Sequence, residues 1–435
     1  MSPAWLLVIV TGCTAAQRTA IFERDMDFDD RGPAGVGEEV AKSSEDKADK
    51  ADDPVLGARS VTFTADVPVR AEPSAASARI GVVGRDARAR PLRAKPPGGG
   101  CERRWIEIAP RGWVCESNLG PTSDAPSEGA PVALDDATAP ELGKYGRVHG
   151  SAWVFDGRED LEAERGRAID VSTTVRSTGV VGYRGARYWT TSNDAYIQTK
   201  WITPFVPSDF HGVPIRDGEL RVAWAHKAGS PKSAVPLRAR PRPDAPVVGH
   251  LDPRAQVDVL ETSPDGRFVR IGEAGWVARA NLRMPVVTTP PEGVGANEHW
   301  FDIDLDEQTL VAYEGARPVY ATLVSSGRSG FKTPPGIARI ESKLRMTTMV
   351  GTQPGDEYSM ADVPWTMFFD GSLAMHGAYW HDGFGDVRSH GCVNLAPRDA
   401  RILYDFASPD APPGWTIVYP DAKSPGSLIR FRGKP

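Results

Sequence analysis

A cysteine near the C-terminus stands among residues that could activate it chemically. The stretch RSHGCVNLAPRDA places Cys392 two residues after His390, and both His376 and His381 lie within sixteen residues upstream. Three of the eight histidines therefore gather around one of only four cysteines. A thiol is a strong nucleophile as the thiolate, which a nearby imidazole can generate or stabilise. We therefore expect Cys392 to be a nucleophile and not a core cysteine.

The backbone beside this cysteine suits the same chemistry. Gly391 allows a tight turn. Its N–H group, together with that of Cys392, can face the oxyanion that forms when a thiolate attacks a carbonyl. Asn394 can form hydrogen bonds that order the loop behind the nucleophile.

The longer pattern resembles the signature of the L,D-transpeptidase catalytic domain. In that family a His and a spacer precede Ser/Thr-His-Gly-Cys, a hydrophobic residue and Asn or Arg; this chain has MHGAYW, then FG, then RSHGCVNLAPRDA. Three other stretches agree. IDLDEQTLVAYEG resembles the opening hairpin of the domain, VSSGRSGFKTPPGIARI its Ser-Gly and Thr-Pro-x-Gly segment, and VPWTMFFDGSLAMHGAYWHDGFG its approach to the active site. The resemblance covers residues 298–419, and a signature of several parts is more specific than one short motif.

The resemblance implies a fold and a set of residue roles. The fold is a β-sandwich with a mixed sheet, and family members attack the bond between residues three and four of a peptidoglycan stem peptide. Carried over to this chain, Cys392 is the nucleophile, His376 is the base, and the carbonyl of Gly377 orients the imidazole. The nucleophile loop and the substrate site are assigned to Arg388, Ser389, His390, Gly391, Asn394 and Trp380. The spacer between His376 and Ser389 is slightly short for the family, so the resemblance does not specify the geometry of the lid.

These roles predict two-step acyl transfer. Cys392 attacks the carbonyl of residue three of a tetrapeptide stem, the terminal D-alanine leaves, and a thioester forms. An amine on a neighbouring stem or on an envelope protein then takes the acyl group. The partners are therefore peptidoglycan stem peptides, and no cofactor is implied. With water as the acceptor the protein is an L,D-carboxypeptidase; outside enzymes, the alternative is a wall-binding protein with a degenerate catalytic domain.

The same side chains also allow a zinc site. Nitrogen and sulfur ligands are available from His376, His381, His390 and Cys392. We favour catalysis because the resemblance gives these residues another role and because no carboxylate is placed nearby as a catalytic base. We therefore expect no metal, a structural or substrate-facing role for His381, and a structural turn at Thr333 and Pro334.

Strands and one short helix must hold these residues in place. Apolar residues 301, 303 and 305 alternate with aspartates, which predicts a half-buried strand. Leu310–Tyr313 is its hairpin partner, with a turn at EGAR. PRDARILYDFA predicts the helix, with Pro397 in the first turn and Asp399 near the positive end. Its apolar face consists of Ala400, Leu403, Tyr404 and Ala407. We place the catalytic domain at 298–425, after a linker at 286–297, in a chain that is mostly β.

An internal repeat precedes this domain. VPVRAEPSAASARIGVVG begins at Val67 and VPLRARPRPDAPVVGHLD at Val235, and RWIEIAPRGWVCESNL aligns without a gap with RFVRIGEAGWVARANL. Short alternating runs broken by Pro or Gly predict strands and turns. Each copy resembles a bacterial SH3-like barrel, and we place the two barrels at 59–120 and 233–285. Such barrels bind wall peptides or hold a catalytic domain in place, and the fold alone does not decide between these.

Two cysteines fall within the first barrel only. Cys101 and Cys115 have no counterpart pair in the second barrel, where Ala278 replaces Cys115. A pair in one copy of a repeat favours a disulfide in an oxidising compartment. Two unrelated free thiols are the alternative.

The segment between the barrels is harder to assign. After a linker at 121–142, residues 143–232 include GARYWTTSNDAYIQTKWITP, in which aromatic residues alternate with polar ones. We expect a β-rich domain here, with a degenerate SH3-like barrel as one candidate.

The N-terminus predicts export. MSPAWLLVIVTGC has a short apolar run that ends at Cys13 and resembles the lipobox of bacterial lipoproteins. The resemblance implies a signal at 1–13 and a lipid on Cys13 that holds the protein at a membrane, the outer one if the cell has two. A plain cleaved signal peptide is the alternative, and both place the protein in the cell envelope or periplasm. Residues 14–58 are dense in charge, which predicts a disordered acidic tether.

The overall composition excludes two other classes of protein. The formal net charge of -6 offers no basic surface for nucleic acid. No apolar run reaches the ~20 residues of a transmembrane helix.

Overall fold

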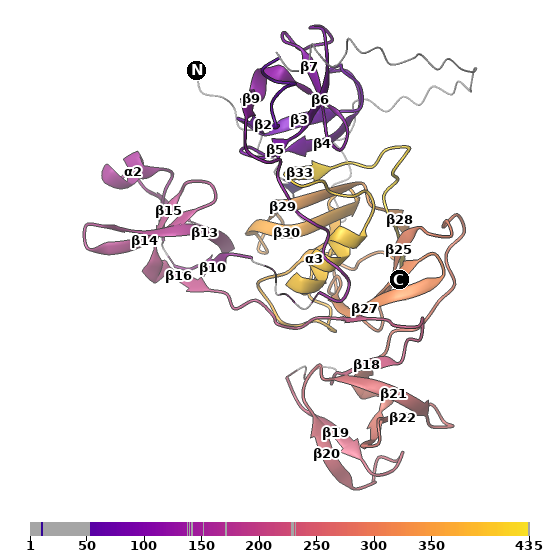
Figure 1. Cartoon of the computed structure of the whole chain (residues 1–435). Helices are drawn as coiled ribbons and strands as arrows, with labels where there is room; N and C mark the ends of the chain where they lie inside the picture. Colours follow the sequence, from indigo (N-terminus) through magenta and orange to yellow (C-terminus); the bar gives the residue numbers. More distant parts are fainter. Residues whose placement is uncertain are drawn as a thin grey trace, which may run out of the picture. The chain divides into compact units, whose positions relative to one another are not determined.

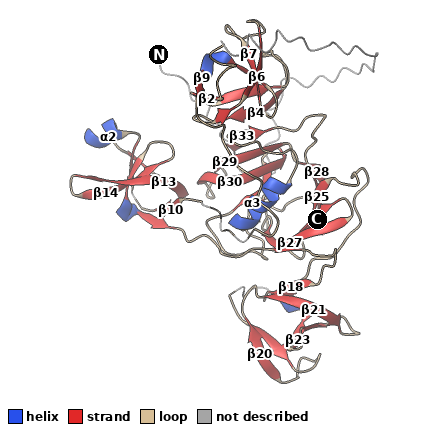
Figure 2. Cartoon of the chain, viewed as in Figure 1, coloured by secondary structure: helices blue, strands red, loops and turns tan. Residues whose placement is uncertain are grey.

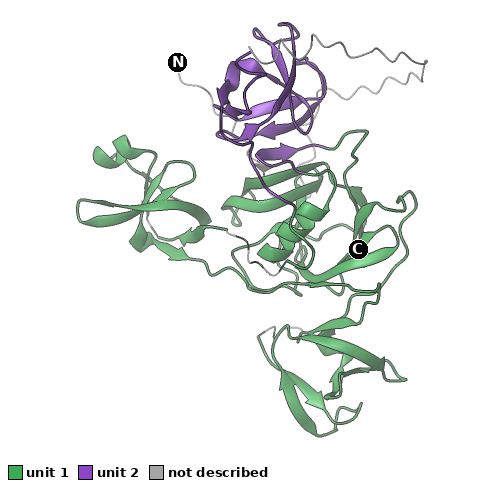
Figure 3. Ribbon diagram, viewed as in Figure 1, with its two compact units in different colours: residues 1–14, 131–410, 420–435 green, residues 15–130, 411–419 purple. Residues whose placement is uncertain are grey.

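The computed structural model describes residues 53–433 except 137, 139, 141, 151, 170, 171, 228, 229 and 231, together with the backbone of a short strand, β1 (Val10–Thr11). Apart from Val10 and Thr11, the predicted signal, the lipid site at Cys13 and most of the predicted tether lie outside these residues. The described chain is mostly β, as predicted (Figure 2). It divides into two compact units, one of residues 1–14, 131–410 and 420–435, the other of residues 15–130 and 411–419 (Figure 3). No helix among the described residues is long and apolar enough to cross a membrane.

The second of these units contains the first barrel. Its elements are β2 (Ser60–Phe63), β3 (Val67–Arg70), β4 (Arg79–Val83), β5 (Arg88–Ala89), β6 (Pro91–Lys95), β7 (Trp105–Ile108), β8 (Trp113–Cys115), the 3-10 turn η2 (Glu116–Asn118) and β9 (Leu119–Thr122). In β3 the inward-facing Val67 and Val69 alternate with Pro68 and Arg70, as the repeat predicts. The N-terminal boundary differs from the prediction, because Val55 is buried in the barrel core. Residues 53–58 therefore belong to the barrel and not to the tether.

The first barrel also takes up a strand from near the end of the chain. Strand β33 (Trp415–Val418) pairs with β4 in antiparallel register, and the indole of Trp415 packs where a side chain on Gly81 would lie. The range 298–425, which we assigned to the catalytic domain, thus includes a strand that completes this barrel. Nothing local in the sequence of β33 specifies its partner, because a strand's neighbours are chosen by tertiary packing.

Cys101 and Cys115 form a disulfide with their Cα atoms 5.7 Å apart. The bridge packs against Trp105 and Trp113, and the indole N–H of Trp105 donates to the carbonyl of Gly98 at 2.8 Å. The disulfide closes the glycine-rich loop that follows β6 onto the sheet.

The segment between the barrels contains a set of antiparallel strands, from β10 to β16 in Figure 1. Its elements are β10 (Lys144–Val148), β11 (Trp153–Phe155), α2 (Arg158–Glu162), β12 (Arg167–Ala168), β13 (Ser172–Tyr183), β14 (Ala186–Thr191), β15 (Tyr196–Gln198), the 3-10 turn η3 (Thr199–Trp201) and β16 (Ile202–Pro204). Val154, Trp189 and Ile197 lie in its core. We call residues 144–204 the middle domain. It is β-rich, as expected.

The rest of the predicted 143–232 range belongs to other elements. Strand β17 (Val213–Pro214) pairs with a strand of the catalytic domain, and β18 (Val222–Ala225) is part of the second barrel. The second barrel therefore begins before the predicted residue 233. The repeat did not reveal β18 because the stretch between this strand and Val235 has no aligned counterpart in the first copy.

The second barrel continues with β19 (Val235–Arg238), β20 (Val247–Leu251), β21 (Gln256–Thr262), β22 (Phe268–Ile271), β23 (Gly275–Ala278), the 3-10 turn η4 (Arg279–Asn281) and β24 (Leu282–Arg283). Its strand order is β20-β19-β23-β22-β21-β18-β24. Val235, Val269 and Val277 are fully buried at its centre.

The remaining elements form the predicted sandwich. They are β25 (His299–Asp304), β26 (Thr309–Glu314), β27 (Arg317–Ser325), β28 (Gly336–Arg339), β29 (Ser342–Gly351), β30 (Tyr358–Asp370), β31 (Leu373–Gly377), β32 (Val393–Leu395), α3 (Pro397–Phe406) and β34 (Leu428–Arg432). Strands β28, β34, β25, β26 and β27 pair in that order, and β29, β30, β31, β32 and β27 form the other set. Two pairs, β25–β34 and β31–β32, are parallel, so the sheets are mixed. Strand β1 pairs in parallel with β29.

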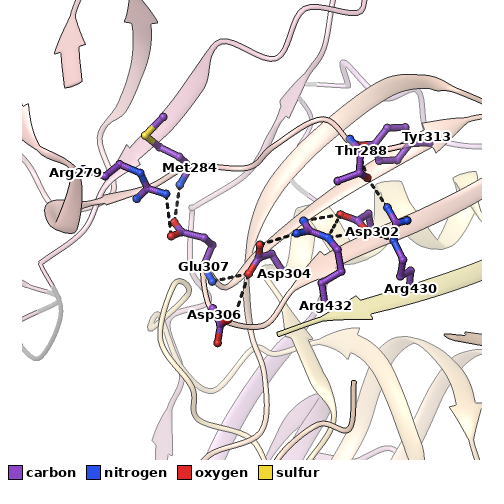
Figure 4. A network of polar contacts seen from close by, with 10 residues as sticks. All are labelled: Arg279, Met284, Thr288, Asp302, Asp304, Asp306, Glu307, Tyr313, Arg430 and Arg432. Carbon is purple, nitrogen blue, oxygen red and sulfur yellow. Dashed lines mark hydrogen bonds and ion pairs between the residues drawn. The ribbon is translucent and has the colours of Figure 1, made fainter. Parts of the chain in front are cut away.

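The opening strand is more deeply buried than the alternation of residues 301–306 predicted. Asp302 is 1% exposed, and Arg430 and Arg432 of the neighbouring β34 both contact its carboxylate (Figure 4). The two guanidinium groups satisfy the buried charge, which allows β25 to be covered on both faces. Strand β26 is its hairpin partner as predicted, and the turn at EGAR connects β26 with β27.

Helix α3 begins with Pro397 at its first turn and buries the predicted apolar face. Asp399 does more than complement the helix dipole. Its carboxylate is fully buried and accepts hydrogen bonds from the hydroxyls of Tyr320 and Thr322 and from the N–H of Gly212. These contacts fix α3 against β27, and hence fix the end of β32 that leads into the helix.

Candidate active site

Two neighbouring parallel strands position the predicted nucleophile and base. His376 lies in β31 opposite Asn394 of β32, and Met375 lies opposite Val393. Cys392 immediately precedes β32, so the register brings it to the edge of β31 that carries His376. Both side chains are buried, with Cys392 1% and His376 2% exposed. The sheet thus brings together two residues that the sequence separates by a long spacer.

The imidazole of His376 is oriented by its own strand. Its Nδ1 lies 3.3 Å from the carbonyl oxygen of Gly377, the contact that the resemblance implied. When Nδ1 carries the proton and donates it to this carbonyl, Nε2 is left as an acceptor. Burial lowers the pKa of His376 to about 4, although the contact with Gly377 raises it. At neutral pH the ring is therefore an uncharged base.

The nucleophile loop is held from both sides. The hydroxyl of Ser389 accepts the N–H of Gly391 at 3.0 Å and donates to the carbonyl of Cys392. Thr333 accepts the N–H of Gly327 at 2.9 Å and donates to the carbonyl of Gly391 at 2.7 Å. Gly391 has a φ of 115°, which a residue with a side chain rarely adopts.

These contacts change two expectations. The N–H of Gly391, which we predicted to face an oxyanion, is already bonded to Ser389. Of the two donors proposed from the sequence, the N–H of Cys392 is therefore the one we retain for that role. Thr333, which we expected only to form a turn, also fixes the backbone of the nucleophile loop.

His390 points toward the hairpin formed by β29 and β30. Its Nε2 lies 2.7 Å from Asp356 Oδ2, and the guanidinium of Arg328 contacts both groups. The rings of Phe331 and Tyr358 flank the imidazole at centroid distances of 4.7 and 5.0 Å. The hydrogen bond from His390 is the largest cause of a lowered pKa of Asp356. Sequence reasoning missed Asp356 and Arg328, since no local pattern links the turn of this hairpin to the nucleophile loop.

Asn394 contacts the spacer between the two catalytic positions. Its side-chain amide lies 2.9 Å from Nε2 of His381, whose Nδ1 accepts the N–H of Gly383. Burial, followed by the charge of Arg388, lowers the pKa of His381 to about 3. His381 thus holds the spacer against β32.

The short spacer folds tightly around its glycines. Ser325 donates to the carbonyl of Gly383 at 2.8 Å, and the N–H of Gly385 donates to Val324 at 2.9 Å. A Cβ on Gly383 would lie 1.9 Å from the guanidinium of Arg388, so Arg388 lies directly over this glycine. Arg388 is exposed, and Trp380 is half-buried with its ring centroid 5.6 Å from that of His376. Both side chains are thus at least partly accessible to solvent.

The second barrel contacts the same spacer. His226, which follows β18, has its Nε2 3.0 Å from Asp386. Arg283 donates to the carbonyl of Gly385 at 3.0 Å, and Arg254 pairs with Asp382. Burial lowers the pKa of His226, and the nearby charge of Arg283 does so as well. A further contact joins Arg279 to Glu307 (Figure 4). This barrel therefore touches the catalytic domain at the spacer.

Within the part of the chain that the structure describes, no group of three or more His, Cys, Asp or Glu side chains is placed to hold a metal ion. Two of the histidines that could have offered ligands have other contacts, His381 to Gly383 and Asn394, and His390 to Asp356.

The comparison with protein families agrees with this geometry. Residues 298–419 match the L,D-transpeptidase catalytic domain, and residues 233–283 match the bacterial SH3 domain. By this match, residues 298–419 are similar to an L,D-transpeptidase catalytic domain. The L,D-transpeptidase domain includes His376, the spacer and Cys392, and the matched SH3 domain is the second barrel.

Solved structures of L,D-transpeptidases are also similar to parts of the chain. They include a mutant of the Enterococcus faecium enzyme (20% identity, 31% of this chain, 50% of that one, TM-score 0.25) and an enzyme from Stackebrandtia nassauensis (24%, 32%, 58%, 0.23). A third is from Mycobacterium smegmatis (19%, 60%, 99%, 0.27). The chain thus covers 50% and 58% of the length of the first two. A comparison with curated proteins gave no match.

Proposed function

We propose that the protein is a cysteine-dependent L,D-transpeptidase that acts on peptidoglycan stem peptides. The proposal is carried by one observation: His376, oriented by the carbonyl of Gly377, lies on the strand adjacent to β32, which Cys392 immediately precedes. An imidazole whose Nε2 is an acceptor, next to a thiol at a strand end, is the arrangement that nucleophilic catalysis requires.

The reaction proceeds in two steps. The thiol of Cys392 gives its proton to His376 while sulfur attacks the carbonyl carbon of stem residue three. The N–H of Cys392 stabilises the oxyanion. The carbon–nitrogen bond to the terminal D-alanine then breaks, His376 returns the proton to the leaving amine, and a thioester remains. An amine of a second stem or of an envelope protein attacks the thioester, loses a proton to His376, and regenerates the thiol.

The direct test is incubation with a disaccharide–tetrapeptide fragment of peptidoglycan. We expect release of D-alanine and a dimeric product, both absent with Cys392→Ala. A carbapenem should add to wild-type protein once, at Cys392, and not to the alanine variant. An adduct of equal amount in the variant would overturn the assignment of the nucleophile.

Two related activities are distinguished by the same products. If water is the acceptor, tripeptide and D-alanine appear without dimer, and the protein is an L,D-carboxypeptidase. If the fragment binds without any turnover, the protein is a wall-binding protein with a degenerate catalytic domain.

We also propose that the protein is exported and anchored through a lipid on Cys13, on the lipobox resemblance alone. More than one acyl chain is needed for stable membrane attachment, so anchoring should depend wholly on this residue. Cys13→Ser should move the protein from the membrane to the soluble envelope fraction and leave turnover of the stem peptide unchanged. Soluble wild-type protein with a cleaved, unmodified N-terminus would support a plain secretory signal.

A further inference from the structure

The middle domain joins the sheet that carries the active-site hairpin. The first residues of β13 pair in parallel with β30, with Ser172 opposite Tyr358 and Thr173 opposite Ser359. The ring of Tyr358 faces His390 of the nucleophile loop at a centroid distance of 5.0 Å. Neither family match covers the middle domain, yet it meets the catalytic domain at the strand that flanks the site.

A closed ring of hydrogen bonds follows this strand pairing. The hydroxyl of Thr174 accepts the N–H of Ala361 at 3.0 Å and lies 2.6 Å from the hydroxyl of Tyr379, which donates to the carbonyl of Ala361 at 2.7 Å. Each donor has one acceptor when Thr174 donates to Tyr379. Thr174 is 1% exposed and Tyr379 is fully buried, so the loss of one hydroxyl would leave buried polar groups unpaired.

A second set of contacts supports the same tyrosine. The ring of Tyr145 stacks on Tyr379 with centroids 3.8 Å apart, and its hydroxyl donates to the carbonyl of Asp362 at 2.8 Å. Arg176 pairs with the carboxylate of Asp362 at 2.7 Å. Asp362 has a φ of 47°, a left-handed conformation that costs energy in a residue other than glycine. Contacts from the middle domain therefore hold a strained residue of β30 in place.

These contacts continue to the catalytic histidine through aromatic rings. Trp380 lies edge-on to Tyr379 at 4.9 Å, and its ring is 5.6 Å from that of His376. The rings of Tyr145, Tyr379, Trp380 and His376 thus form a continuous series of neighbours. A tightly packed aromatic ring cannot shift unless its neighbours shift too. The position of Trp380 therefore depends, through Tyr379, on contacts from the middle domain.

We propose that the middle domain is a fixed wall of the active site, and that Thr174 and Tyr145 are positioning residues that set Trp380 for the substrate through Tyr379. The proposal rests on the proposed function and extends it, since it assigns a role in substrate binding to a segment outside the catalytic domain.

The test compares three threonine variants by hydrogen exchange and by kinetics. Thr174→Val removes the hydroxyl and keeps the shape, Thr174→Ser restores the hydroxyl, and Thr190→Val is the matched control because its hydroxyl contacts Thr178 within the middle domain. In Thr174→Val we expect faster exchange in residues 376–383 but not in α3. The KM for the disaccharide–tetrapeptide fragment should rise roughly tenfold, as the loss of a buried hydrogen bond implies. Alkylation of reduced Cys392 by iodoacetamide, which is too small to need Trp380, should be unchanged.

The serine variant and the control should behave as wild type. Unchanged exchange or KM in Thr174→Val would overturn the proposal. So would faster exchange in α3 as well, because that result would mean general loosening. If Thr174→Val does not fold, exchange and KM are measured instead for Tyr145→Phe, which removes the hydroxyl that bonds to Asp362, and the same results are expected. If wild-type protein does not turn over the fragment, the proposed function fails, whereas the exchange measurement still decides whether the middle domain positions Trp380.

Discussion

The imidazole of His376 is uncharged before substrate arrives, because burial lowers its pKa to about 4. Once Cys392 is reduced, it would face a neutral base, and the proton would move as sulfur attacks. This differs from a preformed thiolate–imidazolium pair, which requires an imidazole that holds its proton at neutral pH.

The rate of acylation should therefore depend on pH in a defined way. Carbapenem acylation of Cys392 should rise between pH 3 and pH 5 with an inflection near 4, as His376 loses its proton, and His376→Ala should reduce the plateau on the order of 100-fold or more. Rapid-quench mass spectrometry measures both. An inflection near 6.5, or an equal plateau in the variant, would contradict the assignment of the base.

Buried neutral histidines also link stability to pH. The pKa of His376 falls from 6.5 to about 4 and that of His381 to about 3 on folding, so the unfolded chain binds protons more readily below pH 6.5. Their contribution is complete above that pH and is lost as the pH falls toward 4 and 3. We expect His376 alone to contribute a loss of up to about 3 kcal/mol. The free energy of unfolding, measured in urea, should decrease from pH 7 to pH 4. It should decrease less steeply with falling pH in His381→Asn. An equal pH dependence of the unfolding free energy in wild type and His381→Asn would show that His381 does not titrate as described.

At the scale of elements, the hairpin of β29 and β30 is tied to the nucleophile loop at its turn. Asp356 makes this connection through His390 and Arg328, and all three side chains are partly exposed. An exposed ion pair contributes little to global stability. Its role is therefore to set the position of the hairpin.

Asp356→Ala should release the turn of the hairpin while the fold remains intact. We expect KM for the stem peptide to rise several-fold with a change in unfolding free energy of less than about 1 kcal/mol. Glu357→Gln is the control, because the hydrogen bond that its carboxylate accepts, from the N–H of Gly355, lies within the turn. Equal KM values in Asp356→Ala and wild type would show that the connection does not position the hairpin.

The number of residues that separates two interacting side chains in the sequence decides whether their contact could be predicted. The loop of Cys392 and the start of α3 at Pro397 were predictable because neighbouring residues define them. The contact of Asp356 with His390 spans 34 residues, and that of Thr174 with Tyr379 spans 205. Such pairs leave no periodicity or motif in the sequence, so the contact of Asp356 with His390 and the proposed role of the middle domain could be inferred only from the structure.

For the whole molecule, the pairing of β33 with β4 means that the first barrel depends on residues encoded near the other end of the chain. Gly81 leaves room for Trp415, and a Cβ there would lie 2.3 Å from the indole. Gly81→Ala should therefore destabilise the first barrel by about 1–3 kcal/mol through overpacking. Gly120→Ala, which adds a methyl group to open space in the same barrel, should be nearly neutral. Thermal unfolding of both variants measures the difference, and equal midpoints would show that Trp415 does not occupy this position in solution.

The long reach of β33 also has a consequence for how the protein folds. Thr416 and Val82 share a hydrogen bond across 334 residues, so this edge of β4 stays unpaired until β33, far along the chain, has been made. Contacts of this separation form slowly, and an unpaired strand edge invites association with other chains in the meantime. Truncation near the C-terminus should thus cause aggregation through the N-terminal barrel, far along the chain from the missing residues.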